Sequence, residues 1–138
     1  MSIKTLLTRI LNYILTKPLT VHAINLSTSY GGYIAFENGL CIQWAFGKPF
    51  TVDSTLTQIA SSGTYTSSGT VALDYPILAT LNKSMMVGQS RYSTGHRVGF
   101  GYNGMSNTTD ARIMVYDYYA RPNDSKWLAQ YILIGLWK

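Results

Sequence analysis

Residues 31–46 of the chain read GGYIAFENGLCIQWAF, two alternating apolar runs around Glu37-Asn38-Gly39. Asn-Gly is a strong hairpin signal because both residues tolerate the positive φ of a tight turn. The stretch therefore predicts a β-hairpin. Leu40, Ile42 and Trp44 share one face of its second strand, and we expect that face to be the inner one, packed in the core or against another chain.

Downstream of the hairpin, further short runs have strand character. They cover residues 70–75, 77–81, 85–89, 97–102, 112–119 and 128–137. Gly, Asn and Asp separate them and no helical crossovers lie between them, which predicts an all-β fold, an antiparallel β-sandwich. The Ser/Thr/Gly-rich residues 53–70 are interpreted as a loop. The last run is apolar on both faces, which predicts a strand buried on both sides.

Upstream of the hairpin, residues 2–17 have the pattern of a short helix. Ile3, Leu7, Ile10 and Ile14 recur at spacings of four, three and four, as in a coiled-coil seam, and Pro18 is expected to end the helix. Isoleucine at such positions favours three or more strands. Residues 1–18 are therefore interpreted as a trimeric coiled-coil stub and residues 19–138 as the sandwich; the alternative is a helix packed on its own domain.

Composition narrows the class of protein. The 138 residues fit one domain, only 12% are charged, and 11 are Tyr, which suits a recognition surface. The net charge of +5 comes from basic residues scattered without a run, so we expect no nucleic-acid partner. No apolar stretch reaches the length of a membrane span, so no membrane insertion is expected. Cys41 is the single cysteine and has no partner for a disulfide within the chain.

Residues that carry chemistry are sparse and scattered. His22, Cys41 and His96 stand at no metal-ligand spacing, and the serines form turn-like clusters without a nucleophile pattern. Asp117 shares a strand face with apolar residues, which favours a hydrogen-bonded or interface carboxylate over a catalytic one. The sequence predicts no enzyme, no cofactor and no metal site.

Three motifs resemble the C-terminal receptor-binding knob domain of phage tail fibres. Gly32-Tyr33-Ile34 followed by Asn38-Gly39-Leu40-Cys41-Ile42-Gln43-Trp44 is similar to its opening signature, residues 70–77 (TVALDYPI) to its strand before an aromatic-Pro-Ile step, and residues 131–135 (YILIG) to its terminal strand. Cys41, Ala45 and the Tyr-Pro step depart from the usual residues of that family. The resemblance implies a homotrimeric sandwich, similar in fold to H-type lectins, at the fibre end in the virion or in a prophage-encoded particle. It also implies other tail or baseplate proteins as partners and attachment to a bacterial surface glycan or surface protein.

Aromatic and arginine side chains, which anchor interfaces and stack on sugars, select the candidate ligand residues. They lie in two loops: Arg91, Tyr92, His96 and Arg97, and Tyr118, Tyr119, Arg121 and Asn123. Three other readings stay open: a trimeric assembly cap of a tail or baseplate, a free-standing lectin, and an enzyme acting on surface glycans.

Overall fold

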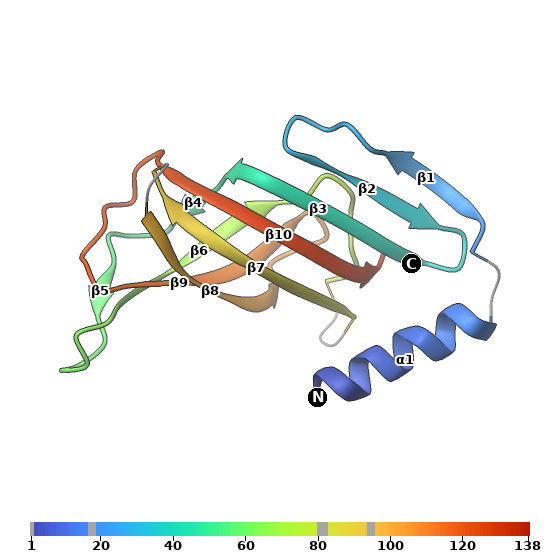
Figure 1. The fold of residues 1–138 in the computed structure, drawn as a ribbon, viewed down its shortest axis with the longest axis horizontal. Coiled ribbons are helices and arrows are strands. Elements are labelled where there is room, and N and C mark those ends of the chain that lie inside the picture. Colours follow the sequence, from blue (N-terminus) through green and yellow to red (C-terminus); the bar gives the residue numbers. More distant parts are fainter. Residues whose placement is uncertain (1, 17–18, 80–82, 94–95) are drawn as a thin grey trace.

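A computed structural model describes residues 2–16, 19–79, 83–93 and 96–138. One helix precedes ten strands (Figure 1). The elements are α1 (Ile3–Thr16), β1 (Val21–Asn25), β2 (Gly31–Phe36), β3 (Leu40–Pro49), β4 (Thr51–Val52), β5 (Thr57–Gln58), β6 (Tyr65–Ala72), β7 (Ser84–Tyr92), β8 (His96–Met105), β9 (Asp110–Asp117) and β10 (Trp127–Leu136). The prediction of a β-rich chain with a short N-terminal helix is confirmed.

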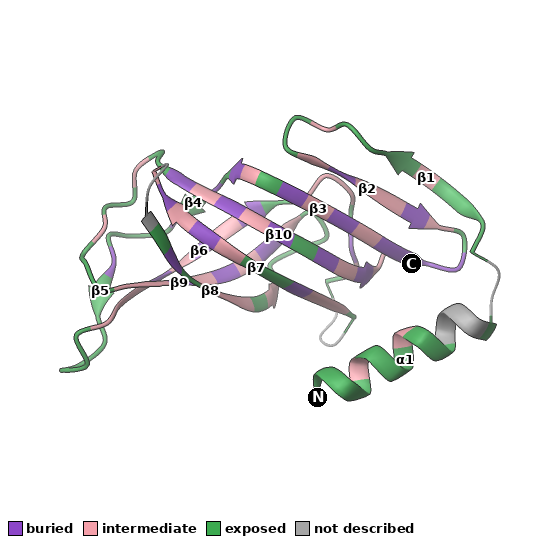
Figure 2. Ribbon diagram, viewed as in Figure 1, coloured by how far each residue is buried: buried purple, intermediate pink, exposed green. Residues whose placement is uncertain are grey.

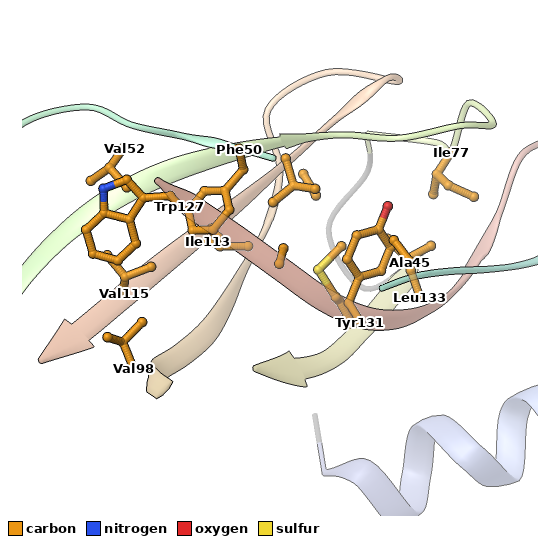
Figure 3. Packing of buried hydrophobic residues seen from close by; sticks show 14 of the residues in the cluster. Ala45, Phe50, Val52, Ile77, Val98, Ile113, Val115, Trp127, Tyr131 and Leu133 are labelled. Carbon is orange, nitrogen blue, oxygen red and sulfur yellow. The ribbon is translucent and has the colours of Figure 1, made fainter. Parts of the chain in front are cut away.

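The strands form one curled antiparallel sheet in the order β1-β2-β3-β10-β7-β8-β9-β6-β4, with β5 paired to β6. Strand β8 joins the two halves, because its first residues pair with β7 and its later ones with β9. The curl turns one face of the sheet inward. Figure 3 shows how side chains from both halves, including Trp127, Val115 and Leu133, fill the space between them.

The predicted hairpin is present as β2 and β3. Its turn differs from the expected one, because only Gly39 of the turn residues 37–39 has a positive φ, of 93°. The Gly39 amide donates to the Phe36 carbonyl at 2.9 Å. Three residues therefore connect the strands, with glycine supplying the left-handed position.

The expectation that Leu40, Ile42 and Trp44 face the core is wrong for Ile42 and Trp44, while their alternative place, against another chain, stays a prediction. Cys41, Gln43 and Ala45 are fully buried, whereas Ile42 and Trp44 are half-buried on the outer side (Figure 2). Leu40 alone of the predicted set is buried. Both faces of this strand are rich in apolar residues, so the alternation in the sequence could not show which face lies in the core. In the structure, the face with the smaller residues Cys41 and Ala45 packs in the core.

Strand positions were also wrong in three places. Strand β6 lies largely within residues 53–70, which were expected to be a loop. Residues 77–81 were expected to be a strand, but residues 77–79 are not strand, and residues 80 and 81 lie outside the described part. Strand β1 was not predicted. Strand β10 is buried on one face only, because Ile132 on its other face is 48% exposed.

Helix α1 begins at a capped end, where the Ser2 Oγ accepts a hydrogen bond from the Thr5 amide at 3.1 Å. Leu6 and Ile10 face the end of the sheet across a hollow of about 160 Å³, while Ile3 and Leu7 of the predicted seam are exposed. The side chain of Ile14, and Pro18 with its predicted helix end, lie outside the described residues. Of the described seam residues, Ile3 and Leu7 are thus exposed, whereas Ile10 faces the sheet.

The three sequence motifs meet inside the fold. The buried Gln43 donates from Nε2 to the Tyr75 carbonyl at 2.8 Å and accepts from the amides of Asp74 and Tyr75 at 3.1 and 3.3 Å. Two residues further on, Ile77 packs so closely on Gly135 that a Cβ there would lie 2.8 Å from its methyl carbon. One polar clamp and one close contact therefore fasten the segment after β6 to β3 and β10.

Candidate functional site

Both predicted loops lie at the same end of the molecule. Figure 1 places the β7–β8 turn and the β9–β10 connection at the end of the sheet opposite to helix α1 and the C-terminus. The sequence placed these loops about 20 residues apart, and the sheet order brings them together because β10 pairs with β7. We call the described part of this end, residues 91–93, 96–99 and 116–126, the tip.

Tyr92 is the internal support of the tip rather than an exposed contact. It is buried, its ring lies 5.0 Å from that of Trp127, and its hydroxyl donates to Asp124 Oδ2 at 2.7 Å. This hydrogen bond raises the pKa of Tyr92 above its usual value and lowers the pKa of Asp124 below its own. The β7 end and the β9–β10 loop are thereby tied to each other.

Arg121 carries this support to the surface. Its guanidinium lies 5.1 Å from the Tyr92 ring centre and 4.9 Å from that of Tyr119, and its Nε donates to Asp117 Oδ2 at 2.7 Å. Cation–π contact and an ion pair together restrict its rotamer. Tyr119 is 63% exposed and Tyr118 76% exposed, so two phenol rings stand in solvent on a fixed base.

Beside these rings lies a hollow of about 190 Å³, which is lined by Thr64, Arg97, Val98, Gly99, Tyr116, Asp117 and Tyr118. The absence of a side chain at Gly99 makes room for Tyr116, whose Cβ lies 3.0 Å from where a Cβ of residue 99 would be. The hollow thus offers two tyrosine side chains, a threonine, an arginine and a carboxylate to a ligand.

The charges of the tip are unbalanced. Arg121 pairs with Asp117, and Lys126 lies 3.5 Å from Asp124. Arg91 and Arg97 oppose each other directly across β7 and β8, and no ion pair joins either of them to a carboxylate among the described residues. The Nε of Arg91 is buried and has no hydrogen-bond partner.

The structure sorts the predicted ligand residues into three groups. Arg97 and Tyr118 line the hollow, with Arg91 as the register partner of Arg97. Arg121 lies against the exposed Tyr119 and the buried Tyr92, and Asn123 is exposed in the β9–β10 loop. The side chain of His96 lies outside the described part. Tyr116 and Thr64 were missed; the glycines of residues 99–104 were a signal, since alternate glycines on a strand make room for a neighbour's ring.

Other chemistry is not assembled in the part of the chain that the structure describes. No three His, Cys, Asp or Glu side chains there gather around a common point as metal ligands would. Burial raises the pKa of the Cys41 thiol to about 12, which keeps it in its unreactive protonated form. The described helix is too short to cross a membrane.

Comparison of the chain with protein-family models, with curated proteins and with solved structures finds no match.

Proposed function

We propose that the chain is the receptor-binding tip of a phage tail fibre, a homotrimeric β-sandwich that attaches to a glycan on the bacterial surface without catalysis. The observation that carries this proposal is the separation of two surfaces: an aromatic and cationic tip at one end of the molecule, and helix α1 at the other end (Figure 1), where Ile3 and Leu7 of its seam are exposed. A fibre tip needs this polarity, since one end joins the shaft and the other meets the cell. The three motifs shared with tail-fibre knobs support the same reading.

Support for self-association comes from the outer side of the sheet. Ile24, Ile34, Ile42, Ile134 and Met85 are register partners in a row across five strands. A second row joins Trp44, Ile132 and Val87, with Phe46 beside it. Phe46 is 64% exposed and Val87 52% exposed. We call these nine residues the outer apolar face.

The occupant that we propose for this face is another copy of the same chain. Side chains without charge make up the whole face, which suits a permanent apolar interface better than a transient polar one. Helix α1 lies beside this face, where its Leu6 and Ile10 line a hollow together with Ile134. Its seam residues Ile3 and Leu7 stay exposed and offer the same neighbouring copies further apolar surface. Three copies would place three tips at the free end.

The test combines mass and attachment. Light scattering should give about three times the chain mass of 15.3 kDa. The labelled trimer should bind whole cells of at least one species in a panel of bacteria. Tyr118→Ala with Tyr119→Ala should reduce cell binding at least tenfold without changing the mass. The matched control is Tyr30→Ala, an exposed tyrosine outside the tip. A trimer that binds no cell surface and no glycan favours the assembly cap, and a monomer contradicts the proposal.

A further inference from the structure

The tip holds two arginines at the spacing of the closest neighbours in a sheet. Arg91 and Arg97 are direct register partners, so their Cβ atoms project from the same face about 4.5–5.5 Å apart. Like charges in this position repel each other, and natural sheets normally place an opposite charge there. Asp117 lines the same hollow as Arg97, but its carboxylate pairs with Arg121, and the carboxylate of Asp124 pairs with Lys126. Among the described residues, no carboxylate forms an ion pair with Arg91 or Arg97.

The Arg91 side chain also lacks a hydrogen-bond partner for one of its nitrogen atoms. Its Nε is buried without a hydrogen-bond acceptor, and a buried donor of a charged group is costly to leave without one. Arg97, by contrast, is exposed and lines the hollow beside Tyr116 and Tyr118. Arg91 is therefore partly buried, whereas Arg97 is exposed and lines the hollow.

From this arrangement we infer that the tip selects saccharides that carry an anionic group, a carboxylate or a phosphate. A guanidinium binds either group through two parallel N–H···O hydrogen bonds, which fixes both position and orientation. The anion lies on Arg97 and is attracted by Arg91 behind it, which removes the repulsion between the two. The sugar ring stacks on Tyr118 or on Tyr116, within the same hollow. This inference rests on the proposed glycan binding and adds the class of glycan.

Titration with matched sugars tests the inference directly. The probes are trigalacturonate, its methyl ester, and galactose 6-phosphate, each added to the intact trimer and followed by NMR shifts or calorimetry. The ester keeps the carbon skeleton and removes the charge, and the phosphate distinguishes the two anion sources. We expect saturable binding of at least one of the two anionic probes. If trigalacturonate binds, its methyl ester should bind at least tenfold more weakly. Salt at 200 mM should weaken the complex with the anionic probe.

Variants then assign the effect to the arginine pair. Arg97→Gln should weaken the anionic complex at least tenfold, and Arg97→Lys should weaken it less, because a lysine keeps the charge and loses the fork of donors. Lys83→Gln removes one positive charge next to β7 at the end where the helix lies and should leave the affinity unchanged.

Three results would overturn the inference: equal binding of acid and ester, an unchanged affinity in Arg97→Gln, or no binding of either anionic probe. If Arg97→Gln still attaches to cells as the parent does, glycan binding stands and only its anionic character is lost. Loss of all cell and glycan binding in the parent trimer removes the proposed function itself.

Discussion

Gln43 shows how one side chain organises a segment with no strand partner of its own. Residues 73–79 cross from β6 towards β7 without regular structure, and the Gln43 amide satisfies three of their backbone groups. Beside it, the Lys48 ammonium lies 2.7 Å from Asp74 Oδ1, and the Thr28 hydroxyl donates to Asp74 Oδ2 at 3.2 Å. Irregular backbone in a core persists only when its polar groups are paired in this way.

Replacing Gln43 by Leu should therefore lower the free energy of unfolding by roughly 2–4 kcal/mol, because two amides and a carbonyl lose their partners in a buried place. Urea unfolding measures the change. Gln89→Leu is the matched control: Gln89 pairs with Gln130 on the partly exposed outer side of the sheet, and its loss should cost less than about 1 kcal/mol. Equal effects at the two positions would contradict the role of the clamp.

Glu37 predicts a dependence of stability on acid pH. The hydrogen bond with the His22 ring, at 2.8 Å, is the main cause that lowers the pKa of Glu37, followed by that from Lys138. Because its folded pKa lies below the ordinary value of 4.5, its contribution is complete above that value and is lost as the pH falls through the folded pKa.

Melting temperatures of the parent and of Glu37→Gln should accordingly differ at pH 5 and converge by about pH 3. His22 also stacks on Trp137 at 4.5 Å, and this ring contact remains in the variant, so only the pH-dependent part is removed. A difference that stays constant from pH 5 to pH 3 would show that the carboxylate is not the titrating group.

Strand β10 separates two kinds of apolar residue that look alike in the sequence. Leu133 is fully buried in the core, and its neighbour Ile132 belongs to the outer apolar face. Leu133→Ala should lower the free energy of unfolding by about 2–5 kcal/mol through the cavity that it leaves. Ile132→Lys should keep the circular-dichroism spectrum of the fold and abolish the trimer in light scattering. A trimer that survives Ile132→Lys would exclude this face as the interface.

The success of sequence reasoning depended on the residues of each strand. The β2–β3 hairpin was predictable because a turn signal lies between two alternating runs. Strand β6 was not, since its buried positions are Ser67, Gly69 and Val71, of which only one is a large apolar residue. Its pairing with β9 over eight residues imposes the extended conformation, and a long-range contact of this kind leaves no mark in local composition. Strand β1 is an edge strand with mostly exposed side chains, which gives it little periodicity.

For the whole molecule, the sequence pointed to two loops, which the structure places at the same end of the sheet (Figure 1), but it did not show how deeply their residues are buried. Arg97 and Tyr118 line one hollow because β8 pairs with β9, and no motif encodes this pairing. Tyr92 and Tyr119 have the same chemistry, yet one supports the tip and the other projects from it. Tyr92 is buried because its ring packs against Trp127, a contact between β7 and β10 that the local sequence does not indicate.

If the chain forms the proposed trimer with three tips, attachment should depend on helix α1, although the helix lies at the opposite end from the tip (Figure 1). Leu7→Lys places a charge in the exposed seam and should shift the mass from trimer towards monomer, whereas Thr8→Lys, one position away, should not. Because linked sites raise avidity by about 10²–10⁴, cell binding of Leu7→Lys should fall by a similar factor while the affinity of a single site for a soluble sugar stays the same. A fall in the single-site affinity would place the helix in the binding surface.

Cys41 allows the local opening of the β2–β3 hairpin to be measured. It is the chain's only thiol, it is fully buried between Leu40 and Ile42 on β3, and its pKa is about 12. A maleimide or disulfide reagent added to the native protein therefore reacts only in the fraction of time when β3 separates from its neighbours. The labelling rate, compared with that of the unfolded chain, gives the free energy of that separation without denaturant. The same rate, measured on the protein with and without bacterial cells, would show whether binding at the tip changes the opening of β3 in the middle of the sheet.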